Sequence, residues 1–276
     1  MEIEEQLPDN ETGQRKDRFG TNQKILVMVA LVIILGLLAW YFLIRDTSPA
    51  SVNSQAANQA RDDALAGVET SAVESLDGLW VIDKEIGVFN NECLTQACGA
   101  SFVGFRIDEE LLGIGGKTVV GRTPGIEAQF TIEGTRILSS DDPNSKSEIP
   151  FVIVDMTQLI TDDAARNNAI KKQAIQTDKY PESTFYLTRS IDFGLETNLE
   201  AGFEIEAIGD LTIHGVTRQE SILLQASFDG NRILVYGELS PIKLADYGIE
   251  KPRAAVVISV EDEANMEFQL YFKKVS

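Results

Sequence analysis

Beyond residue 78, the chain alternates between apolar and polar residues with a period of two, and this pattern constrains its fold most. The alternation is clearest over 265–273, and 125–133, 202–212 and 221–228 repeat it. Successive side chains of a β-strand point to opposite faces, so each segment predicts a strand with one buried and one wetted face. About eight such strands at short spacing are typical of an antiparallel sandwich or barrel.

One segment interrupts the strand pattern with a helix signal. The sequence Thr-Asp-Asp at 161–163 offers an N-cap and an acidic first turn, an Ala- and Lys-containing stretch follows, and Pro181 comes shortly afterwards. These are the start and stop signals of a helix. We therefore expect a mostly β domain over 78–276 with one accessory helix at about Asp162–Gln176.

An uncharged apolar segment, Ile25–Ile44, precedes this domain. As an α-helix it would span about 30 Å, the thickness of the hydrocarbon core of a bilayer. A cleaved signal peptide is the alternative, but its apolar region usually covers only about 7–15 residues. Basic side chains precede the segment at Arg15, Lys16, Arg18 and Lys24. The sequence thus predicts a single-pass transmembrane helix in the cell membrane, with the N-terminus cytoplasmic and the C-terminal domain extracytoplasmic.

The chain on either side of this segment has a different composition. Residues 1–24 are polar without apolar periodicity and are predicted to form a disordered cytoplasmic tail. Residues 45–77 are rich in Ser, Ala, Asn and Gln and are predicted to form a stalk or linker. Within it, 56–68 contains enough Ala for a partial helix, and a flexible linker is the equal alternative.

Composition also limits the chemistry. The 43 acidic and 24 basic residues give a net charge of −19, which argues against a nucleic-acid partner because phosphate binding needs clustered Lys and Arg. His214 is the only histidine, so zinc sites with two or three histidines are excluded, and we interpret it as a structural turn residue. For Cys93 and Cys98 we favour a structural disulfide over a reactive thiol pair. No catalytic residue, metal site or cofactor is predicted.

The apolar faces of the predicted strands leave two interpretations open. A closed eight-stranded barrel has an interior that side chains fill, or that holds one small or slender ligand. An interior of Phe, Ile, Leu, Val, Met and Ala suits a hydrocarbon chain. The same side chains would also suit a solid core, and alternation alone does not separate the two.

Several motifs resemble the YceI-like, lipid- and polyisoprenoid-binding family. They are VDMTQLITDDAAR at 154–166, YPESTFYLT at 180–188 and GDLTIHGVTR at 209–218, with shorter matches at 101–110, 120–124, 245–249 and 259–270. The resemblance covers about 76–274 and rests on the order and spacing of these motifs. It implies a lipocalin-like eight-stranded antiparallel β-barrel with the helix beside it, a long isoprenoid or similar amphiphile in the pore, and neither catalysis nor metal. The anchor and the cysteine pair depart from the common family pattern.

The expected function is a membrane-anchored extracytoplasmic binding protein for a polyisoprenoid or similar long-chain lipid. The alternative is a structural or interaction module of the cell envelope with a solid core; protein partners are not predicted. If the pore holds the ligand, the inward faces should bind it, namely Phe130, Ile132, Val152, Val154, Phe185, Leu187, Phe203, Ile205, Ile222, Leu224, Met266, Phe268 and Leu270. Candidates to meet an anionic head group are Arg106, Arg122 and Arg166.

Overall fold

The computed structural model of the protein describes residues 21–44, 48–65, 75–113, 115–139, 149–195, 197–253 and 257–275. The chain divides into two compact units, Met1–Arg45 and Asp46–Ser276. The predicted cytoplasmic tail lies outside the described residues except at 21–24, and residues 45–47 and 66–74 of the predicted stalk also lie outside them.

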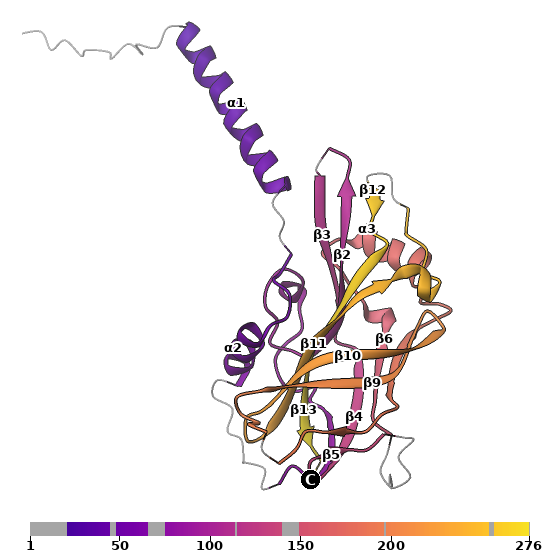
Figure 1. Cartoon of the computed structure of the whole chain (residues 1–276). Coiled ribbons are helices and arrows are strands. Elements are labelled where there is room, and N and C mark those ends of the chain that lie inside the picture. The colour runs from indigo at the N-terminus through magenta and orange to yellow at the C-terminus, as the bar shows by residue number, and fades with distance from the viewer. Residues whose placement is uncertain are drawn as a thin grey trace, which may run out of the picture. The chain divides into compact units, whose positions relative to one another are not determined.

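The first unit contains helix α1, Thr21–Ile44 (Figure 1). Its side chains are described at 23–38 and at Tyr41, and the large apolar ones among them are exposed. Among the residues that the structure describes, no helix meets the length and apolarity needed for a membrane crossing. A helix therefore forms where the sequence predicts one, while its role as a membrane anchor is not confirmed.

The second unit is mostly β, and every strand pairing is antiparallel. Its described strands are β1 (Gly78–Ile82), β2 (Phe102–Leu111), β3 (Gly115–Thr123), β4 (Ile126–Glu133), β5 (Arg136–Ile137), β6 (Phe151–Asp155), β7 (Glu182–Leu187), β8 (Ile191–Asp192), β9 (Phe203–Ile213), β10 (Val216–Phe228), β11 (Arg232–Lys243), β12 (Val257–Val260) and β13 (Glu263–Lys274). Its helical elements are α2 (Ser54–Leu65), α3 (Ala164–Ala169), the π-helix η3 (Ile170–Ala174) and the 3₁₀ turns η1 (Asn91–Leu94), η2 (Met156–Gln158) and η4 (Leu244–Tyr247).

Eight of these strands close into a barrel in the order β1, β4, β6, β7, β9, β10, β11, β13 and back to β1. Strand β1 completes the ring because it pairs with β4 on one side and β13 on the other, so Trp80 lies opposite both Phe130 and Lys274. Strand β2 pairs with the first half of β13 and extends into a hairpin with β3, and β12 pairs with β2. The predicted eight-stranded antiparallel barrel is confirmed.

The outer face of β13 departs from the sequence prediction. Glu267, Gln269 and Tyr271 alternate with apolar residues and were expected to face solvent, yet they are 0%, 3% and 0% exposed. Other segments of the unit cover them: Gln269 Nε2 donates to the carbonyl oxygen of Cys98 at 2.6 Å, and Tyr271 Oη donates to that of Ala57 at 3.4 Å. Alternation shows that the two faces differ, but it does not show what the polar face contacts.

The segment predicted as a stalk forms part of this cover. Helix α2 lies beside the barrel (Figure 1), and Ala57 is fully buried in a cluster with Leu234, Tyr236 and Tyr271. Pro49, just before α2, accepts a hydrogen bond of 2.5 Å from Arg106 Nη2 through its carbonyl oxygen. Where it is described, this segment is therefore packed against the barrel, and of the two alternatives for 56–68, a partial helix and a flexible linker, the structure has a helix.

The accessory helix begins at the predicted place. Asp163 is its N-cap and accepts a hydrogen bond of 2.7 Å from the backbone N–H of Arg166. After one and a half turns of α-helix the backbone widens into the π-helix Ile170–Ala174, which buries Ile170 and Ala174. Widened turns of this kind are frequent at functional sites, and these two buried residues face the barrel interior described below.

His214 and Gly215 connect β9 to β10, and both have positive φ, 53° and 75°. A two-residue hairpin loop with positive φ at both positions is a type I′ turn, which suits the twist of the flanking strands. The imidazole Nδ1 of His214 lies 3.2 Å from the carbonyl oxygen of Tyr247, and its ring packs edge-on against Tyr180 at 4.3 Å. His214 therefore holds a turn in place.

We expect Gly215→Ala to destabilise the barrel more than Gly134→Ala. Both glycines have positive φ, so both substitutions incur the left-handed backbone strain of about 1–2 kcal/mol. A Cβ at residue 215 would also lie 2.5 Å from Tyr180 Cε1, whereas at residue 134 it would meet nothing within 4 Å. Urea unfolding of both variants measures the difference, and equal losses of stability would show that Tyr180 moves aside freely.

Candidate functional site

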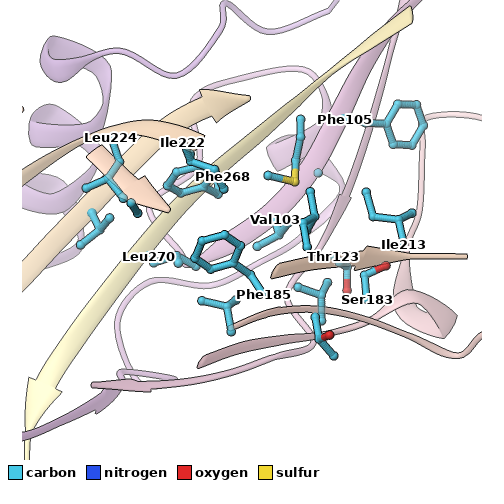
Figure 2. A pocket seen from close by; sticks show the side chains of 18 of the residues that line it. Val103, Phe105, Thr123, Ser183, Phe185, Ile213, Ile222, Leu224, Phe268 and Leu270 are labelled. Carbon is cyan, nitrogen blue, oxygen red and sulfur yellow. The ribbon is translucent and has the colours of Figure 1, made fainter. Parts of the chain in front are cut away.

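The interior of the barrel is hollow. It holds a cavity of about 340 Å³ whose wall comes from β4, β6, β7, β9, β10, β11 and β13, with further residues from β2 and β3 (Figure 2). Nearly all of the lining side chains are apolar. Of the two interpretations that alternation left open, a solid core and a space for a ligand, the structure favours the second.

All thirteen residues predicted to face inward line this cavity, and Figure 2 shows five of them with labels. Their agreement follows from the strand register: Val152 lies opposite Phe185 on β7, and Leu224 lies opposite Ile205 on β9. Directly opposed residues share a face of the sheet, so correct inward assignments on neighbouring strands support one another. The role of these residues in binding a ligand stays a prediction.

Glycine at one wall position makes room for an aromatic ring. Gly209 lies in β9 opposite Leu187, and a Cβ on Gly209 would lie 2.5 Å from Phe185 Cζ and 2.3 Å from the carbonyl oxygen of Tyr186. The ring of Phe185 therefore occupies the space that a side chain at 209 would take. This close approach fixes where Phe185 stands in the cavity wall.

The accessory helix contributes to one end of the cavity. Arg166, Ile170 and Ala174 of α3 and η3 line it, as do Ile249 and Pro252 from the segment before β12. The two sides are joined by a hydrogen bond of 2.9 Å from the backbone N–H of Arg253 to Gln173 Oε1. We call this the helix end of the cavity.

A charged cluster lies at the helix end. Arg166 Nη2 is 2.6 Å from Glu109 Oε1, Arg166 Nη1 is 2.6 Å from Asp162 Oδ1, and Lys117 Nζ is 2.7 Å from Asp162 Oδ2. Burial opposes ionisation of Asp162, but the hydrogen bonds and charges of Lys117 and Arg166 outweigh it and lower its pKa. The cluster thus pairs two carboxylates with two cations and has no net charge.

The other two arginines proposed for a head group lie elsewhere. Arg122 is 2% exposed on the outer face, where its Nε donates to Glu267 Oε1 at 2.7 Å and its Nη1 donates to the carbonyl oxygen of Cys93 at 2.5 Å. Burial lowers the pKa of Arg122, against the opposing effect of the Glu267 charge. Arg106 Nη1 contacts the same carboxylate at 3.4 Å. Because both belong to this buried network, the structure does not bring them to the cavity.

The two cysteines lie outside the cavity wall. Cys93 and Cys98 form a disulfide with an S–S distance of 2.11 Å, packed with Ala100 and Phe102. Among the residues that the structure describes, no group of three or more His, Cys, Asp and Glu side chains is placed to hold a metal ion. The cavity wall therefore offers a ligand mainly apolar contact.

Sequence reasoning missed several lining residues that carry polar groups or lie outside regular alternation. Ser183 lies in the same inward row of β7 as Phe185 and Leu187, so the period of two could have identified it. Glu109 lines the cavity although a carboxylate suggests a wetted face, and Ile170 comes from the helix. Only the tertiary structure brings these last two to the barrel interior.

Comparison with known proteins adds family evidence. A family model described as the YceI-like domain matches residues 96–272. UPF0312 proteins of Vibrio parahaemolyticus and Vibrio campbellii are each 34% identical to the chain over 93 residues, which are 33% of this chain and 44% of the relative. The match thus spans less than half the length of these curated relatives.

Two solved structures are similar in fold. One is a polyisoprenoid binding domain from Saccharophagus degradans implicated in plant cell wall breakdown, with 14% identity, coverage of 71% of this chain and 98% of that one, and a TM-score of 0.48. The other is BcnA of Burkholderia cenocepacia, with 18% identity, coverage of 62% and 95%, and a TM-score of 0.45.

Proposed function

The chain belongs to the YceI-like domain family, and on this premise we propose that it is a lipid-binding protein whose barrel cavity holds a polyisoprenoid or a similar long-chain amphiphile. The observation that carries the proposal is the hollow, apolar barrel interior. A cavity of about 340 Å³ lined by Phe, Ile, Leu, Val and Met offers a hydrocarbon chain contact on all sides. Ligand pockets in proteins are commonly about 300–1,000 Å³.

The energetics of burial support an apolar ligand. Each CH₂ group transferred from water to an apolar interior contributes about 0.8 kcal/mol, so one five-carbon isoprene unit contributes a few kcal/mol. Association itself costs about 4–15 kcal/mol in lost freedom of motion. Several isoprene units therefore offset this cost without any strong polar contact, which fits a wall with few polar groups.

The proposal excludes catalysis. The only histidine packs in the turn between β9 and β10, and its imidazole contacts Tyr180 and the Tyr247 carbonyl. A lipid hydrolase or isomerase needs a nucleophile with its base, or an acid–base pair, within reach of the substrate. At the helix end, the Glu109 carboxylate is held in an ion pair with Arg166, whose guanidinium stays protonated.

Native mass spectrometry of the full chain tests this function. With added geranylgeraniol, a prenyl alcohol of four isoprene units, we expect a one-to-one adduct that a longer prenyl compound displaces. Lipid that copurifies with the protein should compete in the same way. If neither copurified lipid nor any added prenyl compound forms a stoichiometric adduct, the cavity does not serve lipid binding and the proposal fails.

We further propose that α1 anchors the protein in the cell membrane, with the N-terminus in the cytoplasm and the barrel outside. The support is the uncharged run Ile25–Ile44 within α1, the basic residues that precede it, and a disulfide, which is typical of oxidising compartments. Protease added to intact cells should digest an epitope fused after residue 276 and spare one fused before residue 1. The reverse pattern, or release of the protein without membrane lysis, would contradict this topology.

A further inference from the structure

One polar side chain stands in the apolar wall without a partner. Ser183 begins the inward row of β7 that continues with Phe185 and Leu187, and it lies opposite Val154 of β6. It is 8% exposed, and among the described residues its Oγ has no hydrogen-bond partner. A buried hydroxyl without a partner is unfavourable, and native structures rarely retain one. A ligand group in the cavity would satisfy it.

The position of Ser183 identifies one end of the cavity. Strand β6 ends at Asp155, and the chain then passes through Met156 and Leu159, which line the cavity, into α3. The backbone N–H of Met156 donates to the carbonyl oxygen of Pro181 at 2.8 Å, just before β7 begins. Ser183 therefore lies at the helix end, the same end as the Glu109–Arg166 pair.

The charges at this end select against an anion. Among the lining residues that the structure describes, Arg166 is the only basic side chain and Glu109 the only acidic one. The Arg166 guanidinium already contacts two carboxylates at 2.6 Å, and Lys117 is bound to one of them. A phosphate or carboxylate arriving here would have to displace Glu109 or Asp162, because the cluster has no spare positive charge.

We propose that the ligand carries an uncharged hydroxyl or carbonyl group at the end of its apolar chain, and that Ser183 Oγ hydrogen-bonds this group at the helix end of the cavity. This inference rests on the proposed function and extends it to the chemical class of the head group and the direction of binding. A serine hydroxyl suits either group, since it donates to a carbonyl and accepts from a hydroxyl. The rest of the chain then runs along β7 and β9 toward Phe203.

Ser227 provides a matched control. It is also buried, and its Oγ also lacks a partner among the described residues. It differs in two respects: it falls between the inward positions Ala226 and Phe228, and it lies opposite Leu234 near the start of β11, at the other end of the barrel from the turn His214–Gly215. Because a residue between two inward positions of a strand points to the outer face, Ser227→Ala removes a buried serine hydroxyl without touching the ligand.

The test compares three ligands on the full chain and on two variants, Ser183→Ala and Ser227→Ala. The ligands are geranylgeraniol, the corresponding hydrocarbon without the hydroxyl, and geranylgeranyl phosphate. We expect the original protein to bind the alcohol about three- to tenfold more tightly than the hydrocarbon, the range of one neutral hydrogen bond. Ser183→Ala should lose this preference through weaker binding of the alcohol alone, and Ser227→Ala should keep it.

Each other outcome is decisive. Loss of the preference in Ser227→Ala as well would show that it does not depend on a hydrogen bond from residue 183 and would overturn the inference. Tighter binding of the phosphate than of the alcohol would overturn the uncharged head group. Equal binding of alcohol and hydrocarbon, unchanged by either variant, would remove the polar anchor but leave lipid binding intact. Failure of all three ligands to bind would reject the proposed function and this inference with it.

Discussion

Leu224→Trp is expected to lower lipid affinity more than tenfold, while Leu223→Trp leaves it unchanged. The two leucines are neighbours in β10 and point to opposite faces. Leu224 lines the cavity (Figure 2), whereas Leu223 is 54% exposed on the outside. An indole at residue 224 would occupy space that the ligand chain needs. Displacing only two CH₂ groups already costs about 1.6 kcal/mol of binding free energy, more than the 1.4 kcal/mol of a tenfold change.

Copurification measures this effect directly. Both variants and the original chain are extracted with organic solvent, and the lipid is quantified per mole of protein. Lipid associated with α1 is common to all three proteins, so the difference between the two tryptophan variants reports the cavity alone. Thermal unfolding serves as the control for folding, since extra bulk in a hollow core should be tolerated. Equal lipid content in a folded Leu224→Trp protein would show that the ligand does not lie against this wall.

Glu267→Ala is expected to destabilise the barrel by about 3–5 kcal/mol. The Glu267 carboxylate is fully buried and pairs with Arg122, itself 2% exposed, and with Arg106. Removing it leaves the Arg122 charge without its counterion in a covered region of the sheet. Only hydrogen bonds to backbone carbonyl oxygens and the ring of Phe102, 4.1 Å away, would then hold the guanidinium.

The matched control is Glu263→Ala on the same strand. Glu263 contacts Lys243 at 4.0 Å with both side chains at least half exposed, so its loss should change stability by less than about 0.5 kcal/mol. Urea unfolding gives both values. A double variant, Arg122→Met with Glu267→Leu, should recover most of the lost stability, because it removes the stranded charge together with its partner. A small effect of Glu267→Ala would mean that water reaches Arg122.

The inward faces could be predicted from the sequence because their signal is local. A period of two determines which side chains share a face, and the pairing of neighbouring strands keeps that face continuous, as with Val152 opposite Phe185. The helix start at Asp163 was equally local, since a cap depends on a few adjacent residues. Ser183 follows the same period of two on β7, but because serine is polar, hydrophobicity does not identify it as an inward residue.

The cover over the outer face could not be predicted in this way. Glu267 and Gln269 have the composition of a wetted face, and the helix that helps to cover this part of the sheet buries small side chains such as Ala57. Nothing in the alternation shows which distant segment meets a strand. The hollow interior could not be predicted for a related reason. A cavity depends on whether side chains from opposite walls meet across the barrel, and the pattern along one strand does not show this. The family resemblance, and not the residue pattern, favoured the pore.

The closure of the barrel has a consequence for how the chain is made. Strand β1, the first of the ring, pairs with β13, the ring's last strand, and β13 also separates β11 from β2. The ring therefore cannot close until β13 has been made and is free to pair with β1. Until then, the apolar wall and unpaired strand edges stay open, which favours aggregation. Deletion of β13, Glu263–Lys274, should thus produce an insoluble protein rather than a slightly smaller barrel.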